Sequence, residues 1–227
     1  DEYVTVNWIE PLVGKDNRLD GHVLMRLSGA RSSAALAYDY ATDKVLWIAT
    51  LGPSPAHRSI VVDSATPAIY ALDADGRIST LNTSTGEVLS TLQFFTPGKC
   101  YCSGFDTAGD INGDGVMDFV AVANTVFRIS GRNGSVSDVR EPGFPVLPGK
   151  IGRIWDMDGD GYSEMAVLWT RVGLGDSELR VFSPKKGTLL ATFRREEIRS
   201  FSWSKSDCPT GHTIIIGGAT TIDAPGS

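Results

Sequence analysis

The chain has 227 residues, 41% of them hydrophobic, and a formal net charge of −6 at pH 7. This length and apolar content suffice for a buried core and exclude an intrinsically disordered chain. The acidic balance and the scattered basic residues argue against a nucleic-acid-binding protein, and no apolar run reaches the roughly 20 residues of a membrane-spanning helix. The 25 Gly and 11 Pro lie in short clusters, a distribution that indicates many tight turns and favours an all-β fold.

Two kinds of strand segment alternate along the chain. Short β-branched runs, each expected to form a buried strand, occur at residues 59–62, 118–122, 164–168 and 212–216. Between them recurs a unit of two apolar strands joined by a polar turn, at residues 38–47, 80–89, 128–136 and 180–189. Because these segments show no helical periodicity, we predict short strands throughout.

The polar turns set the period of the repeat. If Asp43, Gly86, Gly134 and Gly187 occupy equivalent positions, the intervals between successive members are 43, 48 and 53 residues. A period of about 40 to 50 residues, filled by short strands, is typical of the four-stranded blades of a β-propeller. We therefore predict one β-propeller region over residues 1–227, with about five blade repeats and incomplete ends.

The number of blades bears on whether the ring is complete. Closed propellers usually have about four to eight blades, so we expect a fragment of a seven- or eight-bladed ring, with a complete five-bladed ring as the alternative. The sequence starts without a methionine or a signal peptide and stops soon after the strand predicted at residues 212–216. These ends lead us to expect a processed or partial piece of a larger protein.

One part of the repeat resembles a known family. The segment Ile69–Gly76, followed by Thr85–Leu89, resembles the repeats of quinoprotein-like propellers, also called PQQ repeats. Asp43–Trp47 resembles the end of the same repeat, with Asp where that family usually has Gly. The resemblance covers residues 36–92 and implies a propeller fold.

Two acidic loops, Asp110–Asp118 and Asp156–Glu164, share the pattern D-x-[DN]-x-D-G-x-x-[DE] and lie 46 residues apart. Oxygen atoms at loop positions 1, 3, 5 and 9, with the backbone carbonyl of position 7, can converge on one Ca²⁺ when a Gly at position 6 allows a tight curl. We predict two Ca²⁺ sites, with Mg²⁺ disfavoured because it requires strict octahedral geometry. The candidate ligands are Asp110, Asn112, Asp114, Val116 and Asp118 in the first loop and Asp156, Asp158, Asp160, Tyr162 and Glu164 in the second.

The context of these loops excludes an EF-hand. An EF-hand requires a Glu at position 12 and flanking helices, whereas position 12 is Ala121 in the first loop and Val167 in the second, both within predicted strands. An acidic loop that leads directly into an apolar strand resembles the FG-GAP repeat of integrin-α-type propellers, over residues 104–170. The signature dipeptides of that repeat are poorly represented, and Glu164 replaces Asp at position 9. The alternative is a pair of Asp-Gly turns without metal.

Secretion is indicated by several features together. Asn82 and Asn133 begin N-glycosylation sequons at predicted turns, and Ca²⁺ is available at millimolar concentration outside cells. The chain has three cysteines, Cys100, Cys102 and Cys208. They permit one disulfide to Cys208 and a free thiol, or three semi-buried thiols. We expect an extracellular or cell-surface protein of the secretory pathway.

The sequence favours binding over catalysis. The three histidines have no metal-ligand spacing to one another, and no nucleophile elbow or phosphate-binding loop is evident. We expect a non-enzymatic module that binds another protein or a glycan, or assembles into a surface structure. The alternative is a fragment of a PQQ-dependent dehydrogenase, although the adjacent cysteines typical of those enzymes are separated here by Tyr101. The five tryptophans are expected to form core between blades: Trp8, Trp47, Trp155, Trp169 and Trp203.

Overall fold

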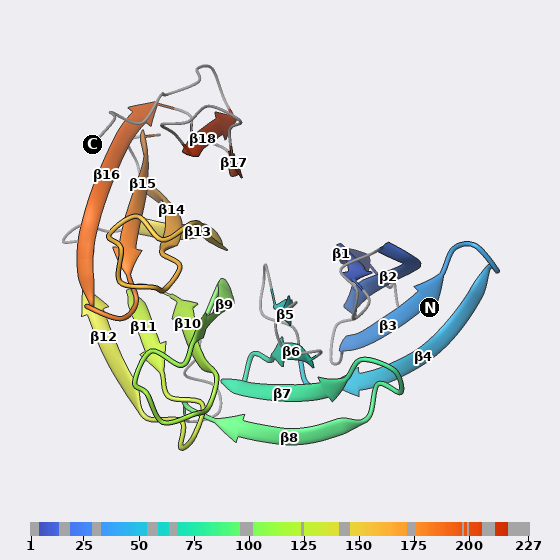
Figure 1. The fold of residues 1–227 in the computed structure, drawn as a ribbon. Helices are drawn as coiled ribbons and strands as arrows, with labels where there is room; N and C mark the ends of the chain where they lie inside the picture. Colours follow the sequence, from blue (N-terminus) through green and yellow to red (C-terminus); the bar gives the residue numbers. More distant parts are fainter. Residues whose placement is uncertain are drawn as a thin grey trace. The chain divides into compact units, whose positions relative to one another are not determined.

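A computed structural model describes most of the chain, and all of the regular secondary structure in the described part is β-strand (Figure 1). The described part contains no helical segment with the length and apolarity that crossing a bilayer requires. The chain divides into two compact units, residues 1–105 with 133–135 and residues 106–132 with 136–227. The described residues are 5–13, 19–28, 33–53, 59–63, 68–95, 102–123, 125–140, 146–171, 176–196, 198, 200–205 and 212–217.

The first unit contains two four-stranded antiparallel sheets in which sequence neighbours pair in order. The first sheet consists of β1 (Thr5–Val13), β2 (Leu19–Ser28), β3 (Ser33–Asp39) and β4 (Lys44–Leu51). The second consists of β5 (Ile60–Asp63), β6 (Ala68–Leu72), β7 (Arg77–Asn82) and β8 (Val88–Gln93).

Two more four-stranded sheets with the same sequential order follow. The third sheet consists of β9 (Gly104–Gly109), β10 (Asp118–Val122), β11 (Val126–Ile129) and β12 (Val136–Arg140). The fourth consists of β13 (Val146–Arg153), β14 (Met165–Arg171), β15 (Asp176–Ser183) and β16 (Thr188–Glu196). A two-stranded sheet of β17 (Ser200–Lys205) and β18 (His212–Gly217) comes last.

The turn between the third and fourth strands is the same in all four sheets. Asp43, Gly86, Gly134 and Gly187 each lie in this turn with φ values of 57°, 71°, 72° and 66°. These values belong to the left-handed region, which Gly adopts without cost and Asp tolerates. The equivalence predicted from the sequence period is therefore confirmed, including the Asp that takes the place of Gly.

Buried apolar side chains of the first unit join its two sheets. One cluster combines Leu24 and Trp47 of the first sheet with Ile60, Ile69 and Leu81 of the second. The indole N–H of Trp47 also donates a hydrogen bond of 2.9 Å to the carbonyl oxygen of Thr83. Trp47 thus contributes to the core between two sheets, as expected.

Among its described residues, the second unit has two apolar clusters. Trp169 of β14 is fully buried with Val120 and Val122 of β10, so this cluster joins the third and fourth sheets. A second cluster lies around Leu168 and Leu179, and Trp155 packs against it. The side chains of the two remaining tryptophans, Trp8 and Trp203, lie outside the described residues.

Candidate metal centre

The second acidic loop connects β13 to β14 and is closed at its base by backbone pairing. The N–H of Ile154 donates to the carbonyl of Glu164 over 2.8 Å, and the N–H of Glu164 donates to the carbonyl of Trp155 over 3.4 Å. Inside this base, Gly159 and Gly161 have φ values of 73° and 86°. The two glycines allow the chain to curl tightly enough for the loop side chains to face inward.

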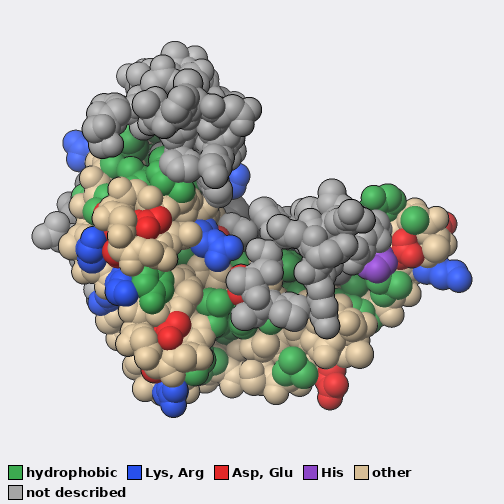
Figure 2. All heavy atoms as spheres, viewed as in Figure 1, with side chains coloured by type: hydrophobic (Ala, Val, Ile, Leu, Met, Phe, Trp, Pro, Cys, Tyr) green, Lys and Arg blue, Asp and Glu red, His purple; other side chains and the backbone are tan. Residues whose placement is uncertain are grey.

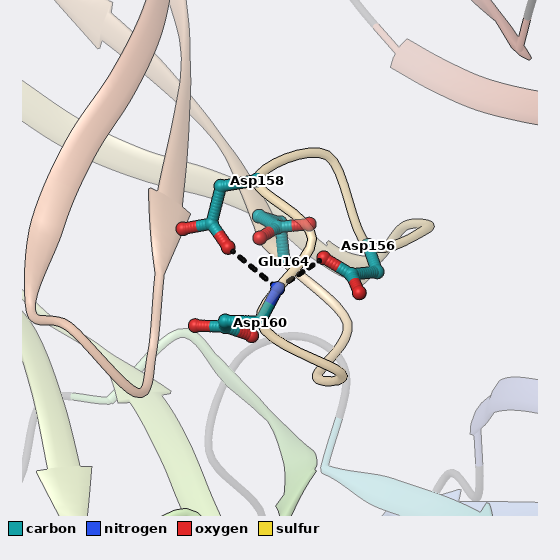
Figure 3. A group of neighbouring side chains, drawn as sticks. All are labelled: Asp156, Asp158, Asp160 and Glu164. Carbon is teal, nitrogen blue, oxygen red and sulfur yellow. Dashed lines mark hydrogen bonds between the residues drawn. The ribbon is translucent and has the colours of Figure 1, made fainter.

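Four carboxylates of this loop come together. One oxygen from each of Asp156, Asp158, Asp160 and Glu164 lies within 4.8 Å of the others. In Figure 3 these side chains gather around the backbone nitrogen of Asp160, whose N–H donates to Asp156 Oδ1 and Asp158 Oδ1, each at 3.2 Å. It is the one such cluster of three or more Asp, Glu, His or Cys side chains that could hold a metal within the described ranges.

Asp156 is held in place by the backbone of its own loop. Its Oδ1 accepts a hydrogen bond of 2.7 Å from the N–H of Gly159, and its Oδ2 accepts one of 2.8 Å from the N–H of Gly161. Asp160 is held from outside the loop, since the hydroxyl of Ser183 donates to its Oδ2 over 3.3 Å. Hydrogen bonds from the loop backbone and from Ser183 therefore orient these two carboxylates.

Glu164 differs from the other three carboxylates in its burial. Its side chain is fully buried, its Oε2 accepts a hydrogen bond from the N–H of Met157, and its Oε1 is buried without a hydrogen-bond partner among the described residues. Burial, together with the three neighbouring aspartates, raises the pKa of Glu164 to about 7. A buried carboxylate oxygen with no donor is costly.

The first acidic loop, between β9 and β10, has the same backbone curl. Asp110 accepts hydrogen bonds from the N–H of Asp114 (2.9 Å) and of Gly115 (2.7 Å), as Asp156 does from its own loop. Gly113 and Gly115 have φ values of 78° and 83°. The two loops therefore share their scaffold.

The last carboxylate of the first loop, Asp118, has donors for both oxygens. Its Oδ1 accepts from the N–H of Gly131 (2.9 Å) and from the side-chain amide of Asn112 (3.3 Å), and its Oδ2 accepts from the backbone N–H of Asn112 (3.3 Å). Burial raises the pKa of Asp118, and these hydrogen bonds oppose the shift. In the second loop, position 3 is Asp158, whose side chain has no amide group that could donate a hydrogen bond to Glu164.

Position 7 of the second loop connects the two loops of the second unit. A Cβ placed on Gly109, next to the start of the first loop, would lie 3.4 Å from Tyr162 Cδ1. Arg128 of β11 adds a polar connection, because its guanidinium donates to the carbonyls of Pro184 and Lys185 at 3.2 Å each.

That the carbonyls of Val116 and Tyr162 bind metal stays a prediction.

Two basic residues that we did not assign from the sequence lie against the loops. Lys186, in the turn between β15 and β16, places its Nζ 3.0 Å from Asp158 Oδ2. Arg132, in the turn between β11 and β12, places its Nε 3.2 Å from Asp114 Oδ2. On the face shown in Figure 2, basic and acidic side chains are correspondingly interspersed over the part of the molecule that contains β9–β16.

Comparisons with known proteins give structural matches alone. No protein-family model matches the chain, and no curated protein sequence matches it. Among solved structures, the chain is similar to Kuenenia stuttgartiensis hydrazine synthase, at 11% identity and a TM-score of 0.60, over 91% of this chain and 55% of that one.

Two further solved structures show the same likeness. One is the Dos1 propeller, at 9% identity and a TM-score of 0.62, over 93% of this chain and 52% of that one. The other is BBS1N, solved in complex with ARL6DN, at 10% identity and a TM-score of 0.59, over 94% of this chain and 62% of that one. The chain spans between about half and two thirds of the length of these structures. With its sequentially ordered four-stranded sheets, it has a β-propeller fold.

Proposed function

We propose that this chain is a calcium-stabilised β-propeller module that binds another protein or a glycan. The observation that supports this most is Glu164, which has a buried oxygen without a hydrogen-bond partner and belongs to a cluster of four carboxylates. Four carboxylates in one loop repel one another. A bound divalent cation would offset this repulsion and would supply the partner that Glu164 Oε1 lacks. The metal therefore has a structural role, which is to fix the loop between β13 and β14.

Size and ligand type favour Ca²⁺ at this position. Ligands at about 2.3–2.6 Å from Ca²⁺ lie at most about 5 Å apart, whereas those around Mg²⁺ lie at most about 4.2 Å apart. The carboxylate oxygens lie within 4.8 Å of one another, a separation that ligands around Ca²⁺ can span. We extend the proposal to the first loop, with Asp110, Asn112, Asp114, Asp118 and the carbonyl of Val116 as ligands. The backbone curl that the first loop shares with the second loop supports this additional site.

Binding of a partner is supported by exposed apolar side chains on two outer strands. Ile48 of β4 is 60% exposed, and Leu89 of β8 is 57% exposed, with Val45, Leu46 and Val88 also exposed nearby in the sequence. Apolar side chains at the surface are candidates for protein contact. BBS1N, which shares the fold, was solved with a bound protein. We propose binding, not catalysis, as the activity of the module; a quinone-dependent redox activity on addition of PQQ and Ca²⁺ would contradict this.

An extracellular or cell-surface location completes the proposal. Cys102 takes part in a disulfide, whose other cysteine lies outside the described residues, and disulfides persist mainly in oxidising compartments. Asn133 of the second sequon is exposed in the turn between β11 and β12 and is available to a glycosyltransferase, while Asn82 is half-buried at the end of β7. Extracellular calcium would keep the metal site filled.

The test is thermal unfolding of the protein in EDTA, in Ca²⁺ and in Mg²⁺. A Ca²⁺ concentration about 100-fold above the dissociation constant stabilises the folded state by about 2.7 kcal/mol. For a chain of this size that corresponds to a rise in melting temperature of about 5–10 °C. We expect this rise with Ca²⁺ and a smaller one with the same concentration of Mg²⁺. An unchanged melting temperature in Ca²⁺ would refute the proposed function.

A further inference from the structure

Lys186 reaches the metal centre from a different part of the blade. Its Nζ lies 3.0 Å from Asp158 Oδ2 and 3.9 Å from Asp160 Oδ2. The side chain of Lys186 is 46% exposed, whereas those of Asp158 and Asp160 are 14% and 9% exposed. An ammonium group with access to solvent therefore meets two nearly buried carboxylates that are candidate metal ligands.

The turn between β15 and β16 fixes Lys186 in this position. The N–H of Gly187 donates to the carbonyl of Ser183 (2.8 Å), and the N–H of Lys186 donates to the Ser183 hydroxyl (3.3 Å). The same hydroxyl donates to Asp160. Ser183 therefore forms hydrogen bonds with both the turn and the loop, and these bonds place the ammonium of Lys186 next to the carboxylates.

The adjacent lysine takes a different direction. Lys185 places its Nζ 4.0 Å from the centre of the Tyr162 ring, a cation–π contact, and within the described part of the chain it forms no ion pair with a carboxylate of the loop. Two lysines next to each other in the sequence thus have the same formal charge and separate partners. Substitution of each lysine in turn therefore distinguishes the effect of a direct contact with the loop carboxylates from the effect of net charge.

The neighbouring blade repeats the arrangement with an arginine. Arg132 occupies the corresponding turn, between the third and fourth strands, and forms an ion pair with Asp114 at position 5 of the first loop. Its guanidinium also donates to the carbonyl of Asp114. In both blades a basic side chain from this turn is the counter-ion of the acidic loop, although the turn lies far from the loop in sequence.

We propose that Lys186 is a built-in cation that competes with Ca²⁺ for Asp158 and so sets the calcium affinity of the second loop. This inference rests on the proposed calcium site. The ammonium compensates part of the carboxylate charge in the metal-free protein. Calcium binding requires the ammonium to leave Asp158, because two cations around a shared carboxylate repel each other. The exposed stem of Lys186 gives it room to withdraw into solvent.

The physical consequence is an affinity suited to a calcium-rich environment. Loss of the lysine–aspartate pair and repulsion between the two cations both oppose calcium binding. Loss of an ion pair at the surface alone costs little free energy. Repulsion between the ammonium and the nearby divalent ion adds to the free energy that opposes calcium binding. We expect removal of the ammonium to tighten calcium binding by about 10-fold, and to lower the melting temperature of the metal-free protein.

The experiment compares three variants with the unaltered chain by calorimetric titration with Ca²⁺ and by thermal unfolding in EDTA. Lys186→Met should bind Ca²⁺ about 10-fold more tightly and melt at a lower temperature in EDTA. Lys185→Met, which removes the same charge one residue away, should change the affinity less than about 2-fold. Lys186→Arg, which retains the cation, should keep the weaker affinity of the unaltered chain.

The outcomes separate this inference from the proposed function. If the unaltered chain binds Ca²⁺ and Lys186→Met binds it equally or more weakly, the role of Lys186 is refuted and the calcium site stands. Equal tightening in Lys185→Met and Lys186→Met would also refute it, because net charge would then be the cause. If none of the four chains binds Ca²⁺, the proposed function fails, and the competition by Lys186 fails with it.

Discussion

Replacement of Glu164 by Gln tests the metal centre most directly. Gln has nearly the size and shape of Glu but no charge, and its amide places donors beside the three aspartates. An unpartnered buried polar group costs about 1–3 kcal/mol. Because Glu164 Oε1 is such a group, we expect E164Q to stabilise the metal-free protein by about that amount at pH 8, where Glu164 is ionised. The melting temperature in EDTA should rise by about 2–12 °C.

The same substitution should reduce the response to calcium, because a neutral amide is a poorer ligand for Ca²⁺ than a carboxylate. Thermal unfolding in EDTA and in saturating Ca²⁺ measures both effects on one protein. We therefore expect a higher melting temperature in EDTA together with a smaller calcium-induced rise. A lower melting temperature in EDTA with an undiminished calcium response would show that Glu164 is neither strained nor a ligand.

Asp118→Asn is the matched control, because Asp118 holds the same position in the first loop. Both of its oxygens accept hydrogen bonds, from Gly131 and from Asn112. An asparagine at this position leaves one of these donors facing an amide N–H, so D118N should destabilise the metal-free protein by about 1–3 kcal/mol. In EDTA we therefore expect E164Q to raise the stability of the protein and D118N to lower it.

Two further predictions concern pH and a turn glycine. Burial raises the pKa of Glu164 from 4.5 to about 7, so the folded metal-free protein holds this proton more tightly than the unfolded chain, and its stability should fall as pH rises from about 4.5 to 7. Urea unfolding in EDTA at several pH values checks this, and E164Q, which has no such proton, should lack the decline. Gly86→Ala combines a φ of 71° with a Cβ 2.5 Å from Trp47 Cε3, and should destabilise the protein by about 2–4 kcal/mol. Gly113→Ala, which has a similar φ and open space around the Cβ, should cost about 1–2 kcal/mol in the same measurement; equal losses would mean that the Trp47 ring moves aside.

The sequence period was a good guide to the fold because blade repeats depend on local chemistry. Asp43 and Gly86 could be aligned since few residues tolerate a left-handed turn, and the structure places both at that turn. The spacing of Asp156, Asp158 and Asp160 likewise predicted that their side chains would meet, because one curled loop contains them all.

The differences between the two loops could not be predicted in this way. Whether both oxygens of Glu164 find donors depends on how deeply the side chain is buried and on the residue at position 3. Asn112 and Asp158 match the same sequence pattern at that position. The approach of Lys186 depends on two turns that are distant in sequence and meet only in the folded blade. Such contacts belong to tertiary structure, so they leave no local signal.

Arg128 gives the second unit a connection that is independent of the acidic loops. Its hydrogen bonds to the carbonyls of Pro184 and Lys185 join two adjacent blades without the carboxylates of either loop. Chelation should therefore open the loop locally while the strands on both sides remain protected. In hydrogen exchange, amides of residues 156–164 should become fast in EDTA and those of β14 should stay slow. Depletion of calcium would then expose one loop to proteolysis long before the fold is lost.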